Sequence, residues 1–371
     1  MLVLTLSYGQ NDHLDSTVYE ELKTRIRADG KNPIFNFQFY FNYNDEYVFD
    51  GAVGVVKKED TTSVKHFKFK SASISKTFIA VMILQLEEEG LIEIKKGISS
   101  YLDSSLICEL KVIDGLDKSH DITVENLLNH TAGLKDYIFD DKKFLFYTHL
   151  FPKRPNLPTD HIRRYKKHNL NRNNSPIGVF HYSDTHYLLL ALLIEKVTGE
   201  SLQSNLNKRI ALPANLTSTY IDTWDSTYTK IMHQYKNKRD LTNKLHPSFE
   251  FGGGGLITTT NDLALFMRSL FSNKLFSDSI TLSKMVTMND VNNYGLGIMR
   301  KKIPENWIKK DATDTLYAYG HDGYFGIEMY YIPKKNITWV SSKGQSNYNK
   351  HVNNFPIWLT LMRICYSEFK N

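Results

Sequence analysis

Ser73 and Lys76 are the residues of this chain whose types and spacing most directly suggest chemistry. A serine hydroxyl becomes an effective nucleophile only when a neighbouring group takes its proton. Residues three apart in a helix share one face, so a helix that opens at Ser73 would bring the Lys76 amine beside the Ser73 hydroxyl. The first N–H groups of that helix would surround the oxygen on which negative charge develops. Taken alone, the pair also fits a capped helix that carries a solvated lysine.

Two further short motifs follow this pair in the chain: Tyr182-Ser183-Asp184 and His321-Asp322-Gly323. Together with residues 67–78 around the serine, they resemble, in the same order, the three motifs of the serine β-lactamase and penicillin-binding-protein superfamily. The segments 122–134 and 252–259 also resemble linking segments of that family, and the resemblance extends from about residue 30 to about residue 345. The match is closer to the branch that contains class C β-lactamases, D-alanyl-D-alanine carboxypeptidases and related esterases.

The resemblance implies a serine hydrolase that uses no metal and no cofactor, with Ser73 as the nucleophile. Ser73 would attack the carbonyl of an amide or ester and form an acyl-enzyme. Lys76 and Tyr182 would share one proton network, in which a lysine base requires a pKa lowered by burial or by nearby positive charge. Which of the two takes the serine proton stays open.

The third motif would contribute one side of the site. His321 would face the site from a strand edge and donate a hydrogen bond to a substrate carboxylate or to Tyr182. Gly323 would let the substrate backbone approach closely. The backbone N–H groups of Ser73 and Tyr324 would form the oxyanion hole, in which the loss of one donor typically costs about a hundred- to a thousand-fold in rate.

Asp184 departs from the family pattern, which usually has asparagine at this position. We place it, with Gly323, among the substrate-binding residues. An amide can donate to a substrate carbonyl, whereas a carboxylate can do so only when it is protonated. The departure argues against strong β-lactam turnover and favours either a substrate with an amine or an ion pair with Lys76. Carboxypeptidase, D-aminopeptidase, esterase and β-lactamase activities are therefore not resolved.

Predicted strands occur at both ends of the chain. Aromatic and polar residues alternate from Phe35 to Tyr43, a period of two that marks a half-buried strand, and residues 47–56 follow as its partner. Residues 324–332 and 337–342 form a predicted hairpin. Amphipathic or apolar patterns predict an opening helix and a terminal helix over residues 17–28 and 355–366, and a helix over residues 263–271 capped by Thr260 or Asn261.

The region between the predicted strands is mostly helical with long loops, which predicts one α+β unit over residues 1–371. Its sheet part would comprise about residues 14–90 and 272–371, and a helical insertion about residues 91–271. The family resemblance implies an antiparallel five-stranded sheet flanked by helices, with an all-helical subdomain. The active site would lie in the groove between these two parts.

Composition limits the partners of this chain. Its 371 residues are 41% apolar and carry a net charge of +6, which is too mild to indicate nucleic acid. We therefore expect a small-molecule or peptide substrate. No apolar run reaches membrane-spanning length, and the opening residues 1–10 lack the basic start of a signal peptide. We favour a periplasmic or secreted location, because a cell-wall role requires one, and the oligomeric state stays open.

Two other interpretations compete with the hydrolase. One is a catalytically silent relative that binds peptide or cell-wall fragments, and the other is an unrelated binding protein with chance motifs. A loss of catalytic activity is disfavoured because the chain retains Ser73, Lys76, Tyr182 and His321. A chance match is disfavoured because the motifs occur in the family's order. A covalent serine probe would separate a hydrolase from a silent relative.

Overall fold

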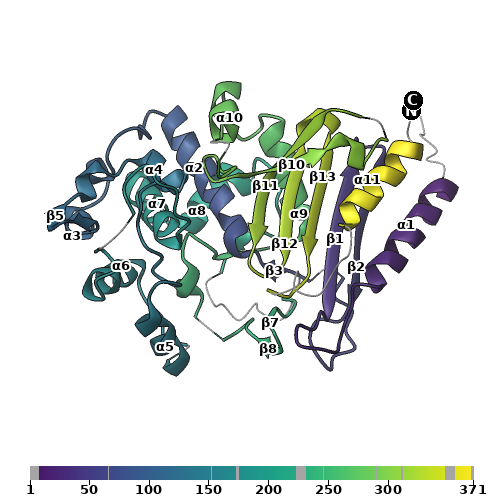
Figure 1. Cartoon of the computed structure of the whole chain (residues 1–371), viewed down its shortest axis with the longest axis horizontal. Coiled ribbons are helices and arrows are strands. Elements are labelled where there is room, and N and C mark those ends of the chain that lie inside the picture. Colours follow the sequence, from purple (N-terminus) through teal and green to yellow (C-terminus); the bar gives the residue numbers. More distant parts are fainter. Residues whose placement is uncertain are drawn as a thin grey trace.

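The central element of the structure is a six-stranded antiparallel sheet with strand order β10-β11-β12-β13-β1-β2. The computed structural model describes residues 8–65, 67–151, 153–172, 175–222, 231–244, 246–288, 291–310, 312–346 and 356–368. The sheet strands are β1 Asn36–Tyr43, β2 Tyr47–Gly54, β10 Met299–Pro304, β11 Thr315–Gly323, β12 Ile327–Ile332 and β13 Ile337–Ser342. Because β1 pairs with β13, the two ends of the chain build one sheet (Figure 1).

Helices fill most of the middle of the chain. They are α1 Tyr8–Lys23, α2 Ser75–Glu88, α3 Ser104–Ile107, α4 Val124–Leu128, α5 Lys142–Leu150, α6 Pro158–Lys167, α7 Asp184–Thr198, α8 Leu202–Leu206, α9 Thr260–Phe271, α10 Ser279–Val286 and α11 Ile357–Glu368. Short strands accompany them: β3 Phe69–Lys70, β6 Tyr220–Ile221 and β9 Leu256–Thr258 form a second sheet, while β4 Val112–Ile113 pairs with β5 Leu116–Asp117 and β7 Tyr235–Lys236 with β8 Arg239–Asp240.

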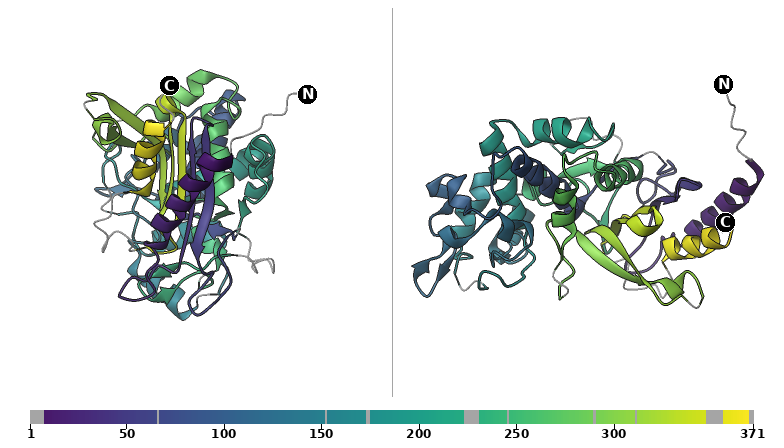
Figure 2. Two further views of the ribbon diagram at one scale, coloured as in Figure 1. Left: turned by 90° about the vertical axis from the view of Figure 1, so that its right-hand side faces the viewer. Right: turned by 90° about the horizontal axis from the view of Figure 1, so that it is seen from above.

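Helices from different parts of the chain cover the two faces of the main sheet. The first and last helices, α1 and α11, contact each other and pack on β2 and β1 (Figure 2). Alternate residues of β1, Phe37, Phe39 and Phe41, form a buried layer with Trp339 and Trp358 on this side. Each fully buried side chain of this size contributes about 1.5–3 kcal/mol. The other face packs against α9, which contacts β1, β12 and β13.

Strand β1 is buried on both faces, whereas the alternating pattern predicts a half-buried strand. The polar side chains of its second face bind loop carbonyls instead of water. The Gln38 Nε2 group donates to the carbonyls of Val64 and Phe67 at 2.9 and 2.7 Å, and Asn36 Nδ2 donates to the His233 carbonyl at 3.0 Å. These acceptors satisfy the buried amide NH2 groups of both side chains.

Helix α2 connects the sheet with the helical region. Its residues from Ser75 to Leu86 are all buried, and it packs against α7 and α8. The short 3₁₀ turn that precedes α2, Ala72–Ile74, lies against β11 of the sheet. A serine in this turn is therefore held between the two parts of the molecule, with the sheet on one side and the helical region on the other.

The predicted α+β class is confirmed, with differences in detail. The sheet has six strands where five were expected, because β10 adds to its edge. The opening helix begins at Tyr8, and residues 1–7 and 347–355 lie outside the described residues. Helix α9, capped by Thr259, lies within the range assigned to the helical insertion and yet packs on the sheet. None of the helices in the described residues is long and apolar enough to cross a membrane.

Candidate active site

Ser73 lies in a tight turn between β3 and α2. Ala72 has a φ of 49°, a left-handed conformation that costs a residue other than glycine about 1–2 kcal/mol. The turn thus places Ser73 in the 3₁₀ segment, and α2 itself begins at Ser75. The Ser75 hydroxyl donates to the Ala72 carbonyl at 2.8 Å and accepts from the Leu256 amide at 3.2 Å. Ser75 therefore ties the turn to the strand that follows the glycine-rich loop.

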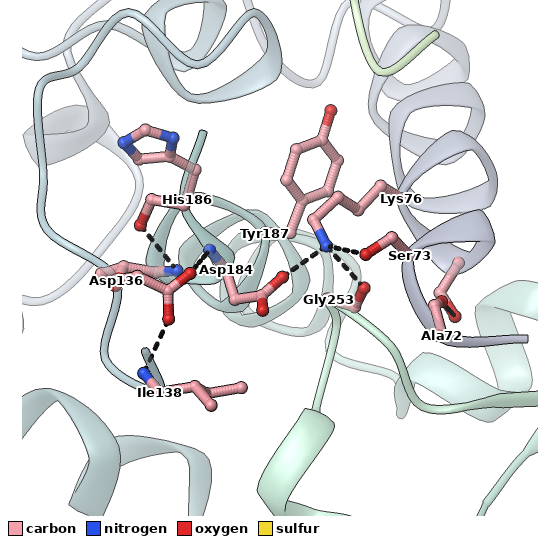
Figure 3. A network of polar contacts seen from close by, with 12 residues as sticks. Ala72, Ser73, Lys76, Asp136, Ile138, Asp184, His186, Tyr187 and Gly253 are labelled. Atoms are coloured by element: carbon pink, nitrogen blue, oxygen red, sulfur yellow. Dashed lines mark hydrogen bonds and ion pairs between the residues drawn. The ribbon is translucent and has the colours of Figure 1, made fainter. Parts of the chain in front are cut away.

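Lys76 lies directly behind Ser73, as the spacing predicts. Its Nζ atom is 3.1 Å from Ser73 Oγ and 2.8 Å from the Gly253 carbonyl, and it forms an ion pair with Asp184 (Figure 3). These three acceptors match the three hydrogens of an ammonium group. Burial alone would lower the pKa of Lys76, but the Asp184 carboxylate outweighs it, so the pKa is raised. The expected lowered pKa is thus absent, and the resting side chain is a cation.

Asp184 opens helix α7, where it is held by a second carboxylate that the sequence analysis missed. The Asp184 amide donates to Asp136 Oδ2 at 2.7 Å, and the amides of Ile138 and Phe139 donate to Asp136 Oδ1 at 2.7 and 2.9 Å (Figure 3). Burial, with the charge of Asp184 as the next cause, raises the pKa of Asp136 to about 7. Asp136 follows the segment 122–134 by two residues, but its spacing alone gives no reason to single it out.

Tyr182, the residue before the Ser183 N-cap of α7, also lies beside Ser73 and Lys76. Its ring lies 5.0 Å from Lys76 Nζ and 4.3 Å from the His130 ring, measured to ring centroids. Burial raises the pKa of the Tyr182 hydroxyl, although the positive charge of Lys76 and hydrogen bonding to Ser73 and Lys76 oppose this. The resting Tyr182 is therefore a neutral phenol beside the nucleophile.

A cavity of about 330 Å³ opens in front of Ser73. Four of the sequence-predicted residues line it: Ser73, Tyr182, Asp184 and Tyr324. Much of the remaining wall is apolar and comes from Tyr137, Ile138, Phe139, Leu241, Pro247, Phe249 and Phe325. The predicted nucleophile thus faces a space large enough for a small substrate.

His321 does not occupy the expected position facing the site. It is fully buried, its Nδ1–H donates to the Asp322 carbonyl at 2.7 Å, and its Nε2 accepts from the Tyr294 hydroxyl at 3.1 Å. Burial, reinforced by Lys76, lowers the pKa of His321 to about 3. Because both ring nitrogens are occupied and the ring is neutral, His321 contacts Tyr182 only as a packed ring, with centroids 6.3 Å apart.

Gly323 has a packing role that the sequence analysis did not anticipate. A β-carbon at this position would lie 2.6 Å from the Ser71 carbonyl and 2.9 Å from Ile327 Cβ. Only glycine lets β11 approach the active-serine turn this closely. Substrate approach over Gly323 remains a prediction.

The glycine-rich loop and the residue before it complete the cavity wall. The Gly253 carbonyl accepts from Lys76, and Glu250, which the sequence analysis did not assign, lines the cavity. Burial raises the pKa of Glu250 to about 7, with Lys70 opposing and Asp184 and Asp222 reinforcing the shift. Among the described residues, no group of three or more His, Cys, Asp or Glu side chains could hold a metal ion.

Comparisons with known proteins agree on the family to which the sequence is similar. The Beta-lactamase family model matches residues 36–349. A Bacillus subtilis penicillin-binding protein, PbpX, is 25% identical over 274 residues, which are 69% of this chain and 63% of that protein. The teichoic acid D-alanine hydrolase of Staphylococcus aureus is 28% identical over 218 residues, 57% of this chain and 48% of that protein. The chain thus spans less than two thirds of these relatives.

Solved structures show the same fold. D-amino acid amidase from Ochrobactrum anthropi SV3 superposes with a TM-score of 0.72 at 18% identity, over 95% of this chain and 99% of that chain. A D-stereospecific amidohydrolase from Streptomyces superposes with a TM-score of 0.70 at 20% identity, over 96% and 99%. With a family model that spans most of its length, the chain belongs to the beta-lactamase family.

Proposed function

We propose that this protein is a serine hydrolase that cleaves an amide or ester through an acyl-enzyme on Ser73. The observation that carries the proposal is the 3.1 Å contact between Lys76 Nζ and Ser73 Oγ at the wall of a cavity of about 330 Å³. The names of the relatives, which include a D-alanine hydrolase and a D-amino acid amidase, support an amide or ester as the bond that is cleaved.

Activation of Ser73 requires a proton acceptor, and in the resting protein both candidates are protonated. The Lys76–Asp184 ion pair offers a route, because transfer of one proton from Lys76 to Asp184 leaves a neutral amine beside Ser73 Oγ. A neutral pair becomes more favourable when a substrate fills the cavity and excludes water, since burial disfavours charges. Lys76 would then take the serine proton as Ser73 attacks the carbonyl. Tyr182 would give its own phenolic proton to the leaving group and would regain a proton from Lys76.

The amides of Ser73 and Tyr324 are the proposed oxyanion hole. Both residues line the cavity, and Tyr324 follows β11 directly. Amides fixed by a helical turn and by a strand end are preorganised, so they bind developing negative charge without rearranging.

A catalytically silent relative that binds peptide or cell-wall fragments is the second candidate. The observation that favours it is the raised pKa of both Lys76 and Tyr182, which leaves the resting site without a ready base. The two candidates differ in whether Ser73 forms a covalent bond.

Intact-protein mass spectrometry after incubation with a fluorescent penicillin and, separately, a fluorophosphonate tests the proposal. We expect an adduct of one probe molecule that is absent from Ser73→Ala. Penicillin labelling would indicate peptidase or lactamase chemistry, and fluorophosphonate labelling alone would indicate an esterase or another peptidase specificity. The absence of an adduct with both probes in a folded protein would favour the silent relative.

A further inference from the structure

Glu250 brings a carboxylate to the cavity beside the segment that anchors Lys76. It ends the short 3₁₀ turn Pro247–Glu250, and its backbone carbonyl accepts from the Gly254 amide at 2.9 Å. The resulting tight turn folds the side chain over Gly254, where a β-carbon would lie 3.2 Å from Glu250 Cδ. The preceding residue, Gly253, supplies the carbonyl that binds Lys76 Nζ. Glu250 and Ser73 therefore line the same cavity.

The other charged groups of the cavity wall already interact with neighbours. Asp184 is paired with Lys76, and Lys70 Nζ lies 3.0 Å from Asp222 Oδ2. Lys236 is exposed, with its Nζ 5.9 Å from the centre of the Tyr324 ring. Within the described part of the chain, the Glu250 carboxylate makes no ion pair or hydrogen bond, so only the charges of Lys70 and Lys76, which do not bond to it, partly offset its loss of water.

An unpaired carboxylate in a partly desolvated cavity creates a preference for a cationic ligand. The burial that raises the pKa of Glu250 to about 7 also strengthens its attraction for an incoming positive charge. An ammonium group would restore the charge balance and donate charge-assisted hydrogen bonds. The apolar wall formed by Tyr137, Phe249 and Phe325 would accept an uncharged side chain next to that group.

Building on the proposed hydrolase function, we propose that Glu250 binds a free ammonium group of the substrate. The enzyme would therefore prefer amides or esters that carry a free amino group besides the bond that Ser73 attacks. In this role Glu250 is a specificity-determining residue rather than part of the proton network. Asp184, which replaces the usual asparagine, would then serve mainly as the partner of Lys76.

Binding measured without turnover tests this inference separately from the proposed reaction. Isothermal titration calorimetry of the Ser73→Ala protein would compare phenylalaninamide with N-acetylphenylalaninamide, each as both enantiomers. We expect the free amine to bind at least about tenfold more tightly, because acetylation removes the charge that Glu250 pairs with. Adding Glu250→Gln should reduce that ratio to about threefold or less, whereas adding Glu93→Gln, an equal charge change at an exposed loop residue outside the cavity, should leave it unchanged.

Several outcomes would overturn the inference. These are equal affinity for the two ligands, tighter binding of the acetylated one, no binding of either at millimolar concentration, or a ratio that survives Glu250→Gln. An equal loss for both ligands would assign Glu250 to the structure of the cavity. Failure of Ser73 to form an adduct would contradict the hydrolase proposal alone, since this binding assay uses no reactive serine.

Discussion

Lys76 and Lys301 belong to networks of similar composition in different surroundings. Each contacts at least one carboxylate and lies near a tyrosine ring, Lys76 Nζ at 5.0 Å from the Tyr182 centroid and Lys301 Nζ at 3.9 Å from that of Tyr330. Lys301 Nζ is 3.0 Å from Asp322 and 3.2 Å from Glu328, and Glu328 is also 2.9 Å from Lys343. On the sheet, two lysines therefore face two carboxylates across neighbouring strands.

The two networks differ in burial and in one acceptor. The Lys76 side chain is 0% exposed and one of its three acceptors is Ser73 Oγ, whereas that of Lys301 is 32% exposed and its acceptors are carboxylates. Charge pairing alone therefore does not mark a reactive site. What distinguishes the first network is a hydroxyl within reach of the lysine and a cavity in front of that hydroxyl.

Replacing each lysine by methionine should give the largest contrast. Lys76→Met should slow acylation by at least about a hundredfold, since proton transfer to a positioned group typically contributes that much. It should also lower the free energy of unfolding by about 3–5 kcal/mol, because Asp184 remains buried without its partner. Lys301→Met should cost only about 1 kcal/mol or less and leave the acylation rate unchanged.

Stopped-flow labelling with a fluorophosphonate and urea unfolding measure these two quantities. Normal acylation by folded Lys76→Met would remove Lys76 from the proton network. A comparable loss of rate in Lys301→Met would show that the sheet network also acts on Ser73.

The tyrosines provide the next contrast. Tyr182→Phe should reduce turnover by about a hundredfold with little loss of stability, since the hydroxyl beside Ser73 would be missing from the proton network. Tyr330→Phe removes a 3.0 Å hydrogen bond to Asp322 and should cost about 1 kcal/mol of stability without changing the rate. Steady-state kinetics and thermal unfolding of both variants check this prediction, and an active Tyr182→Phe protein would make Tyr182 a packing residue.

Substitution of the carboxylates should separate the networks by pH dependence. Asp184 raises the pKa of Lys76, so Asp184→Asn should lower that pKa and make the amine available in more acidic solution. In a plot of acylation rate against pH, the acidic limb should therefore move to lower pH. Asp322→Asn, in the sheet network, should leave the limb in place, and an unmoved limb in Asp184→Asn would show that Lys76 does not control the rate.

The sequence allowed prediction of the sheet wherever a strand was apolar or alternated with a period of two. The hairpin of β12 and β13 and the pairing of β1 with β2 follow this pattern. Strand β10, with the sequence MRKKIP, did not show it, because an edge strand is partly exposed and tolerates charge and proline. The sixth strand was missed for that reason.

The site was predictable where short spacing or a motif fixes contact. Ser73 and Lys76 meet because they lie one turn apart, and the order of motifs indicated Tyr182 and Asp184. The burial of His321 depends on Tyr294, and the exposure of Glu250 to the cavity depends on a turn closed by Gly254. Such contacts arise from tertiary packing, so no local sequence pattern predicts them.

The smallest predicted contrast is in how the stability of each network depends on pH. Burial alone would raise the pKa of Glu328, but Lys343 and Lys301 hold it at about 2, below its ordinary value of 4.5. The resulting stabilisation is present above pH 4.5 and is lost as the pH falls through about 2. Asp136, which binds the Asp184 amide in the Lys76 network, affects the pH dependence of stability in the opposite direction, since its pKa is raised from 3.8 to about 7. Its stabilisation is present below pH 3.8 and is lost as the pH rises through about 7.

Urea unfolding of the wild type, Glu328→Gln and Asp136→Asn between pH 2 and pH 8 tests these opposite signs. Glu328→Gln should lose stability at neutral pH and show a smaller further loss in acid than the wild type. Asp136→Asn should remove part of the decline in stability from about pH 4 to pH 7, because the amide cannot ionise. Its single oxygen can still accept from the Ile138 and Phe139 amides, whereas the hydrogen bond from the Asp184 amide is lost, which lowers stability at every pH. Parallel curves for all three proteins would contradict the assignment of these titrations, and the two networks would then differ in burial and in the hydroxyl beside Lys76 but not in how they respond to pH.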